Sequence, residues 1–416
     1  MHNLERHRVA ARRADLLMVV GFFAILAYPN LVFFRDPAAV KEMERIENRV
    51  LSPRPPVWRL WAAPADFTRE FKSFLDDQFE GRDQLVTFNS LTRYKALNAS
   101  VDVRVIPGKH GSLFYAGEAV VPPRDFGHEA AKYRGVLKMS DHRLQRIREI
   151  LTARKRWAEG MGAKFFFVIA PDKSTTYPEL LPDWLDKGEG PTITDKLVDY
   201  LRSTSDIDLI DLRPPLQEAK RGGKPLFFMR DTHWNDEGAF VGYQEITQRL
   251  VKDFPAIKPL GPDDVVRKSQ RRQGGDLAMM LHLQGAFWEP SPCVWVKSPR
   301  ASVAPFRYNA TPISSWSAPP ISYEAPDPSL PKALIYHDSF MDRLMPQLVE
   351  NFQSTIFIRD HRIVGSTIEG YRPDVVIHEC VERNLYYLAD MTDDLIPNPD
   401  PALLAEQVSP NSPVRR

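Results

Sequence analysis

The chain has 416 residues, of which 43% are hydrophobic, 26% charged and 11% aromatic. This is the composition of a globular protein with a sizeable core, and it excludes a collagen, a low-complexity polymer and a wholly disordered chain. Because 55 basic residues face 54 acidic ones, the net charge of +1 gives no electrostatic basis for nucleic-acid binding, and two cysteines cannot build a disulfide scaffold or a Cys-rich zinc site.

The N-terminal segment predicts a membrane anchor. Four arginines among residues 1–13 precede an apolar run, residues 16–34, that is almost free of charge. A run of this length suffices for one helical crossing of a bilayer, and the basic flank predicts a cytoplasmic N-terminus. No small-residue cleavage site follows the run, so we expect a single uncleaved transmembrane helix with the rest of the chain in a bacterial periplasm. A cleaved signal peptide and a buried core helix are the alternatives.

Composition and periodicity divide the chain into four regions. The 36 prolines indicate many turns, and they are dense in residues 285–331 and in residues 396–416. The predicted regions are a cytoplasmic tip and anchor (1–35), a juxtamembrane region with helical periodicity at 64–98 (36–103), the main domain with a Pro-rich insertion of loops and short strands near 285–331 (104–395), and a disordered tail (396–416).

The main domain alternates short apolar runs with amphipathic stretches. Such runs, separated by helices, indicate a three-layer α/β/α domain in which helices cover both faces of a central, mostly parallel sheet. The predicted strands are 164–170, 207–212, 225–229, 333–336, 354–358 and 374–378, and the predicted helices are 140–160, 191–204, 236–253 and 342–352.

Polar clusters follow several of these strands, at the edge where an open α/β sheet gathers its functional groups. The run 225–229 leads to Asp231 and His233, and the run 333–336 leads to Ser339. A hydroxyl nucleophile needs a base in contact with it, and the base needs an orienting group. Two residues apart in a loop, the Asp231 carboxylate can reach the near ring nitrogen of His233. The geometry that acyl transfer needs is therefore available, although an Asp-x-His pair is more often a surface or capping pair and a serine after a strand is more often a helix cap.

A metal site is the alternative at this edge. Histidines and aspartates stand near the ends of several predicted strands, and a two-metal hydrolase can use such a set. The spacing lacks the blocks of metal phosphatases, and Ser339 would then have no role. We expect neither metal nor cofactor. The alternative set is Asp231, His233, His337, Asp338, His361 and His378.

Several motifs together resemble the alginate O-acetyltransferase J/X family, whose catalytic domain is SGNH-hydrolase-like. DTHWN followed by a downstream DSF is the specific part, and the resemblance runs from about residue 40 to 390. The matching stretches are EFKSFLDDQFEGRDQLV, GKHGSLFYAGE, APDKSTTYPELLP, RDTHWNDEGAFVGYQ, HDSFMDRLMPQL and RPDVVIHECVERNL. Without a carbohydrate-binding module after residue 390, the chain is more like the membrane-anchored J-type member.

The resemblance implies a Ser-His-Asp triad of Ser339, His233 and Asp231. The glycine that usually precedes Asp-Ser is His337 here, and its side chain is expected to crowd the nucleophile turn or to contact the substrate. Lys173 is a candidate for binding an acidic sugar, unless it is a solvated loop lysine. Trp234 is a candidate for stacking on a sugar ring, unless it packs beneath the site. Tyr177 and Arg359 complete the candidate substrate-binding residues.

The implied function is a periplasmic O-acetyltransferase that moves an acetyl group to hydroxyls of an exopolysaccharide, alginate or similar, through an acetyl-serine. By the same resemblance, a multi-pass membrane O-acyltransferase supplies the acetyl group, and the chain works in an exopolysaccharide biosynthesis complex. Two alternatives stay open. A carbohydrate acetylesterase would use the same triad with water as acceptor, and a non-catalytic scaffold of a secretion complex would not use it.

Overall fold

The computed structural model describes most of the chain after residue 50. The described residues are 19–20, 38, 40–41, 43–44, 50–78, 82–117, 120–121, 126–135, 137–185, 187–308, 319–363, 370–391 and 395. Except for residues 19 and 20, the predicted anchor at 16–34 lies outside them, as does the predicted tail at 396–416. Among the helices of the described part, none combines the length and the apolar character needed to cross a bilayer.

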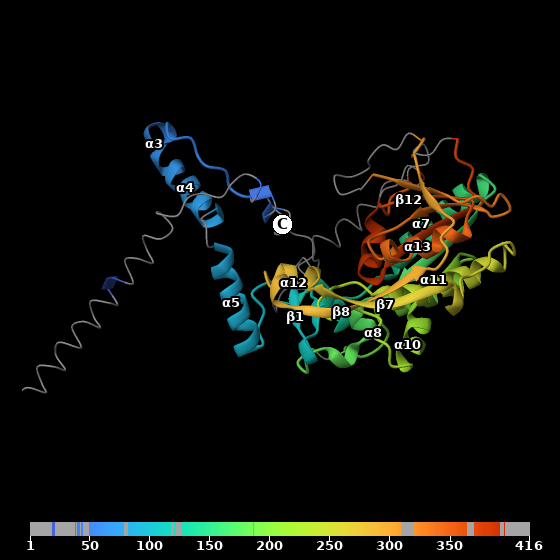
Figure 1. The fold of residues 1–416 in the computed structure, drawn as a ribbon, viewed down its shortest axis with the longest axis horizontal. Helices are drawn as coiled ribbons and strands as arrows, with labels where there is room; N and C mark the ends of the chain where they lie inside the picture. The colour runs from blue at the N-terminus through green and yellow to red at the C-terminus, as the bar shows by residue number, and fades with distance from the viewer. Residues whose placement is uncertain are drawn as a thin grey trace, which may run out of the picture. The chain divides into compact units, whose positions relative to one another are not determined.

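The chain separates into two compact units. The smaller unit comprises residues 1–97 and 279–283, and the larger one comprises residues 98–278 and 284–416 (Figure 1). Three helices of the smaller unit are α3 (Arg59–Ala62), α4 (Pro64–Gln78) and α5 (Arg82–Leu97). The division falls at residue 97, a few residues before the predicted boundary at 103.

The elements after residue 98 alternate strands and helices. The strands are β1 (Val105–Pro107), β2 (Leu113–Tyr115), β3 (Val120–Val121), β4 (Phe126–Gly127), β5 (Lys164–Ala170), β6 (Asp208–Asp211), β7 (Val265–Gln273), β8 (Trp288–Val296), β9 (Ser302–Ala304), β10 (Ile321–Glu324), β11 (Lys332–Tyr336), β12 (Ser354–Ile358) and β13 (Val375–Val381). The α-helices are α6 (His128–Tyr133), α7 (Asp141–Gly160), α8 (Lys173–Thr176), α9 (Ile193–Thr204), α10 (Arg213–Arg221), α11 (Asp236–Val251), α12 (Asp276–Met280) and α13 (Met345–Leu348). The 3-10 helices are η1 (Lys109–Gly111), η2 (Pro178–Leu180), η3 (Pro262–Asp264), η4 (Gln284–Ala286), η5 (Met341–Arg343), η6 (Val349–Asn351) and η8 (Glu382–Asp390).

A seven-stranded sheet in the order β6-β5-β13-β11-β12-β10-β9 forms the centre of the larger unit. The first five strands are parallel, and β10 and β9 extend the sheet as antiparallel strands. Strand β5 is buried along its length after Lys164, which explains its unbroken apolar sequence: helices cover both of its faces.

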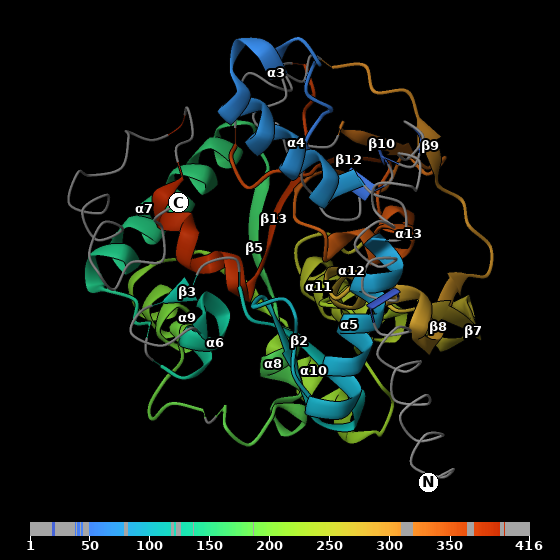
Figure 2. The same cartoon turned by 90° about the vertical axis from the view of Figure 1, so that its left-hand side faces the viewer.

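Alternate residues of the strands supply two separate cores. Phe166, Ile335 and Ile377 face one core with residues of α10, α11 and α13, whereas Phe167 and Leu334 face the other with residues of α7, α9 and η8. Figure 2 shows β5 and β13 between these two groups of helices. The unit is therefore a three-layer α/β/α domain with a central, mostly parallel sheet, as the sequence predicts.

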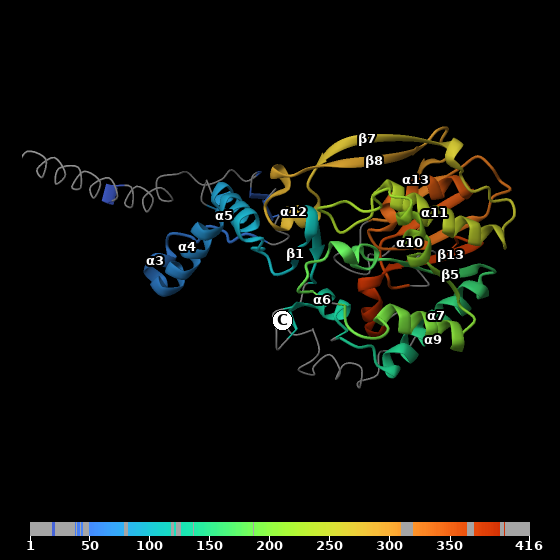
Figure 3. The same ribbon diagram turned by 90° about the horizontal axis from the view of Figure 1, so that it is seen from below.

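Three predicted features differ from the structure in detail. The run 225–229 was expected to be a strand and is part of a loop that forms a single isolated bridge. Its apolar side chains are buried in the core, which explains the apolar sequence without strand pairing. The stretch 285–331 holds a nine-residue strand, β8, that pairs in full with β7. Figure 3 shows this β7–β8 hairpin running past α11 and α13. The helix expected at 342–352 is divided into η5, α13 and η6, with Pro346 at the first turn of α13. Both cysteines, Cys293 and Cys380, are free thiols.

Candidate active site

The candidate site lies at the carboxyl edge of the parallel strands. Strand β11 ends at Tyr336, so that Asp338 and Ser339 emerge in the turn that leads to η5. The loop that carries Asp231 and His233 reaches the same edge from the segment before α11. In a parallel sheet this edge collects the residues that follow each strand, which brings groups distant in sequence into one place.

The loop 226–235 is a narrow arm closed by main-chain bonds. Phe227 bridges Trp234, and the Asn235 amide donates to the Leu226 carbonyl over 2.9 Å. The Asn235 side chain then caps α11 by accepting from the amides of Glu237 and Gly238. A Cβ on Gly238 would lie 2.2 Å from the Leu226 carbonyl oxygen, so glycine is required for this close approach. The cap and the bridge together fix where the tip of the loop, with His233, can lie.

Asp231, His233 and Ser339 form one hydrogen-bonded chain. The His233 Nδ1–H donates to Asp231 Oδ1 over 2.8 Å, and His233 Nε2 accepts from the Ser339 hydroxyl over 2.7 Å. The carboxylate is buried and the imidazole keeps a quarter of its side chain exposed. The ring also packs against Phe340, with centroids 5.1 Å apart. This is the geometry in which a base can activate a hydroxyl nucleophile while a carboxylate holds its tautomer.

A cation stabilises the buried carboxylate of this chain. Arg272, near the end of β7, donates from Nη2 to Asp231 Oδ2 over 2.8 Å, while Oδ1 accepts from the His233 side chain and amide. Burial alone would raise the pKa of Asp231, but the hydrogen bonds and charges of His233 and Arg272 outweigh it and hold that pKa well below its usual range. Asp231 is therefore ionised at any pH near neutral.

A second carboxylate stands next to the first. Asp276, at the start of α12, accepts from the Thr232 amide over 2.7 Å and places Oδ2 3.5 Å from His233 Nδ1. Burial and the charge of Asp231 raise the pKa of Asp276. Asp231, His233 and Asp276 bring ligand atoms within 4.8 Å of one another, the spacing that a metal ion needs. These atoms are already engaged by hydrogen bonds and by the Arg272 cation, which favours a hydrogen-bonded chain over a divalent ion.

The turn of Ser339 leaves the nucleophile's amide available. Within the described residues, the Ser339 N–H donates no hydrogen bond, whereas the amides on either side are engaged. Asp338 accepts from the Phe340 amide over 3.0 Å and its own amide donates to Glu379 over 3.1 Å. An unengaged N–H at the nucleophile is suited to stabilise an oxyanion as it develops on the attacked carbonyl.

Two of the predicted substrate-binding residues are part of the packing. Lys173 is buried, and its Nζ donates to the carbonyls of Leu113 and Met229 over 2.8 and 2.7 Å; burial lowers the pKa of Lys173 to about 7. The Tyr177 hydroxyl accepts from the Leu226 amide over 2.9 Å. Both side chains thus bind main-chain atoms of the segment that leads to His233. Lys173 is buried, so it is neither solvated nor open to a sugar.

Trp234 and His337 are also buried, and only Arg359 lies open at the edge. The Trp234 indole donates to the Phe340 carbonyl over 3.0 Å and has no accessible face, so it cannot stack on a sugar. His337 donates from Nδ1 to the Asp338 carbonyl over 2.7 Å, and burial lowers the pKa of His337 to about 4. Its ring packs edge-on against Phe357 and is almost wholly buried. Arg359 is exposed beside Asp342.

The comparison with protein families matches part of the chain that carries this site. Residues 105–306, a little under half of the chain, match the family described as SGNH hydrolase-like domain, acetyltransferase AlgX. Residues 105–306 are thus similar to an SGNH hydrolase-like acetyltransferase domain, and the matched segment includes Asp231 and His233 and ends before Ser339.

Individual relatives are distant. A stretch of 134 residues is 28% identical to the probable alginate O-acetylase AlgJ of Pseudomonas fluorescens, covering 31% of this chain and 32% of the relative. The chain thus matches about a third of the length of that curated relative. Among solved structures, Bacillus cereus PatB1 is 18% identical with a TM-score of 0.46, covering 60% of this chain and 92% of that one. The O-acetyltransferase domain of Pseudomonas putida AlgJ is 18% identical with a TM-score of 0.42, covering 73% and 97%.

Sequence reasoning missed four residues that surround Asp231 and its loop. Arg272, Gly275 and Asp276 contact Asp231 or its neighbours, and Glu289 of β8 accepts from the Met229 amide over 2.8 Å. They lie about forty residues or more after Asp231, in segments read as an insertion or left unassigned. The doublet Gly274-Gly275 followed by an aspartate was the one local signal of a close approach there.

Proposed function

We propose that the chain is an O-acetyltransferase that acts on hydroxyl groups of an exopolysaccharide, alginate or similar. The observation that carries the proposal is the placement of His233 between Asp231 and Ser339 at 2.8 and 2.7 Å. The match of residues 105–306 to an acetyltransferase family supports acetyl as the group transferred. The name of the AlgJ relative supports a polysaccharide of the alginate type as acceptor.

The proposed reaction has two acyl transfers. Ser339 Oγ attacks the donor's acetyl carbonyl while His233 Nε2 takes the hydroxyl proton, and that proton leaves with the donor's departing oxygen. The product of this step is an acetyl ester on Ser339. A sugar hydroxyl then attacks this ester and gives its proton to His233, which returns it to Ser339 Oγ. Asp231 stabilises the imidazolium in both steps, and the Ser339 amide faces the oxyanion.

The cellular setting belongs to the same proposal. The basic and apolar N-terminal residues support one membrane anchor with the larger unit in a bacterial periplasm. Acetyl-CoA is a cytoplasmic donor, so a multi-pass membrane O-acyltransferase would have to hand the acetyl group across the bilayer. We place the chain in an exopolysaccharide biosynthesis complex on this ground.

Intact mass spectrometry tests the chemistry. The full chain in detergent is incubated with an aryl acetate, alone and with acidic or neutral oligosaccharides, beside Ser339→Ala. Ser329→Ala is the matched control, because Ser329 lies before the start of β11, at the other end from Ser339, and pairs with Asp327 on the surface. We expect one acetyl adduct in the wild type and in Ser329→Ala, none in Ser339→Ala, and acetyl on one class of sugar.

Each other outcome identifies an alternative. Release of free acetate with no sugar product, again lost in Ser339→Ala, would indicate an esterase. Absence of any adduct and of donor turnover would refute the triad and favour a scaffold role.

A further inference from the structure

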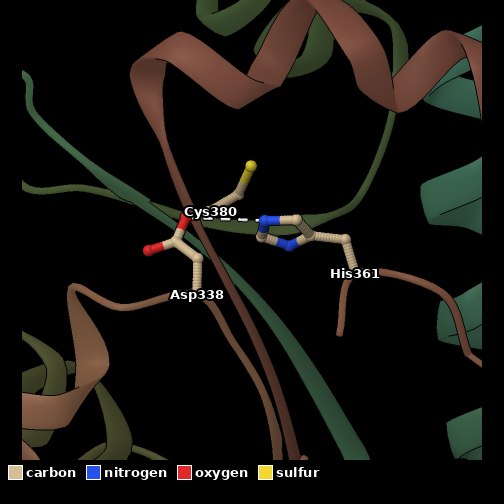
Figure 4. Close-up of side chains that lie close together, drawn as sticks. All are labelled: Asp338, His361 and Cys380. Atoms are coloured by element: carbon tan, nitrogen blue, oxygen red, sulfur yellow. Dashed lines mark ion pairs between the residues drawn. The ribbon is translucent and has the colours of Figure 1, made fainter. Parts of the chain in front are cut away.

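A second buried polar chain runs to the residue before the nucleophile. Arg154 of α7 places Nη1 2.9 Å from His378 Nδ1, and His378 Nε2 lies 3.2 Å from His361 Nδ1. His361 Nε2 in turn lies 3.5 Å from Asp338 Oδ2. Figure 4 shows the His361 ring directed at Asp338, with Cys380 beside them. None of these groups except Asp338 belongs to the turn that carries Ser339, and the proposed reaction does not use them.

The guanidinium of Arg154 determines which atom donates in each hydrogen bond from His378 to Asp338. A guanidinium has no acceptor, so His378 Nδ1 must accept from it and the proton of the neutral His378 ring must sit on Nε2. Burial beside the Arg154 cation lowers the pKa of His378 well below its usual value, which keeps that ring neutral. His378 Nε2 therefore donates to His361 Nδ1, and the proton of His361 is left on Nε2, where it faces the Asp338 carboxylate.

A metal ion is the competing explanation for the same side chains. Asp338, His361 and Cys380 place an oxygen, a nitrogen and a sulfur within 4.8 Å of one another. A protonated Nε2 offers no lone pair to a metal, however, and Arg154 enforces that protonation through His378. Burial also raises the pKa of the Cys380 thiol well above its usual value, which disfavours the thiolate that a metal requires. The donors fit a hydrogen-bonded relay and do not fit a metal centre.

The position of the Asp338 carboxylate controls the position of Ser339. Its Oδ1 accepts from the Phe340 amide over 3.0 Å, and its Oδ2 accepts from the Val381 amide over 2.8 Å. One carboxylate thus ties the main chain on the far side of Ser339 to the end of β13. A shift of this carboxylate would move Ser339 against His233, where reacting groups tolerate displacements well below 1 Å.

We propose that His361, held with its proton on Nε2 by Arg154 and His378, is a positioning residue that fixes the Asp338 carboxylate and through it the nucleophile turn. The inference rests on the proposed role of Ser339, and it assigns His361 no contact with the reacting atoms. Asn384 Nδ2 lies 3.3 Å from Asp338 Oδ2 and also 3.3 Å from His361 Nε2. An amide nitrogen only donates, so with the His361 proton on Nε2 the Asn384 amide donates to Asp338 and not to His361. The four-residue relay links the packing of α7 against the sheet to the geometry of the nucleophile.

Two variants of His361 separate positioning from simple packing. His361→Leu keeps the approximate volume and removes the donor, whereas His361→Gln keeps an N–H of similar reach. With an aryl acetate as probe, we expect His361→Leu to acylate Ser339 10- to 100-fold more slowly with KM within twofold of wild type. We expect His361→Gln to recover to within threefold. Should His361→Leu fail to fold, His361→Asn, whose amide is too short to reach Asp338, replaces it with the same expectation.

Equal losses in His361→Leu and His361→Gln would refute a donor role, and so would full activity of His361→Leu. A second measurement needs no activity. In the ¹⁵N-histidine-labelled chain, two-bond proton–nitrogen correlations report each tautomer, and His361→Gln and His378→Gln assign the two signals among the ten histidines. We expect a proton on Nε2 of both rings. A proton on Nδ1 of His361 would overturn the relay even if Ser339 proves inert, which keeps failure of the relay distinct from failure of the proposed function.

Discussion

Gly275 is the residue at which a single added carbon should disable the site. It lies just before α12, and a Cβ built on it would be 2.1 Å from Asp231 Oδ2 and 2.5 Å from both Cγ and Cβ of Asp231. The backbone of Gly275 is not in the left-handed region, so alanine introduces no backbone strain of its own. Gly275→Ala therefore tests one thing, the space that the triad carboxylate needs.

The size of the displacement follows from the contact. Ordinary contacts of a Cβ begin at 3.4 Å, so the Asp231 oxygen must retreat by about 1.3 Å. Because Cβ and Cγ of Asp231 are also too close, rotation of the carboxylate cannot relieve the overlap, and the whole side chain must move. The bonds at stake are those from His233 and from Arg272, both 2.8 Å long. Misplacement on this scale, up to full loss of the orienting carboxylate, should slow acylation by about 10²- to 10⁴-fold, or about 3–5 kcal/mol.

The assay is single-turnover acetylation of Ser339 by an aryl acetate, followed by intact mass, with thermal melting of each variant as a check on folding. Gly285→Ala is the matched control, because a Cβ there meets nothing within 4 Å and should leave the rate unchanged. We expect Gly275→Ala to lose rate with little change in KM and to remain folded. A folded Gly275→Ala with wild-type acylation would refute the reasoning, because it would show that the Asp231 position does not control the reaction.

Three further predictions concern neighbouring side chains. His337→Asn should make the stability of the protein less sensitive to acid. With a folded pKa of about 4, His337 contributes up to about 3 kcal/mol of stability above pH 6.5, and this contribution is lost as the pH falls towards 4. The free energy of unfolding in urea should therefore fall over this pH window more in the wild type than in the variant. Arg272→Gln should slow acylation by at most about a hundredfold, less than Gly275→Ala, since Asp231 still accepts from His233 and orients it; a larger loss at constant folding would mean that the cation itself takes part. Lys173→Met should lower the free energy of unfolding by about 1–3 kcal/mol in denaturant, because its Nζ satisfies buried carbonyls, and should leave KM for an oligosaccharide acceptor unchanged. A raised KM in a stable Lys173→Met variant would restore this lysine to the substrate site.

The fold was readable from the sequence because burial on both faces leaves a local record. A strand such as β5 must be apolar throughout, and polar residues can follow only where it leaves the sheet, so the run 164–170 and the position of Ser339 after β11 were predictable from periodicity and order alone. The choice of Asp231, His233 and Ser339 needed the family resemblance as well, since each of these residue types is common in caps and surface pairs.

What stands around those three residues was decided by the tertiary structure. Trp234 and Lys173 are of residue types that often bind sugars, but both are buried. Trp234 packs in the core, and Lys173 donates to main-chain carbonyls. Arg272 and Gly275 come from a hairpin and a loop far along the chain, and nothing in their local sequence specifies which carboxylate they will meet. The periodicity of a sequence reports how each helix or strand is buried. Contacts between elements depend on which distant loops the folded chain brings together, and only the tertiary structure shows that.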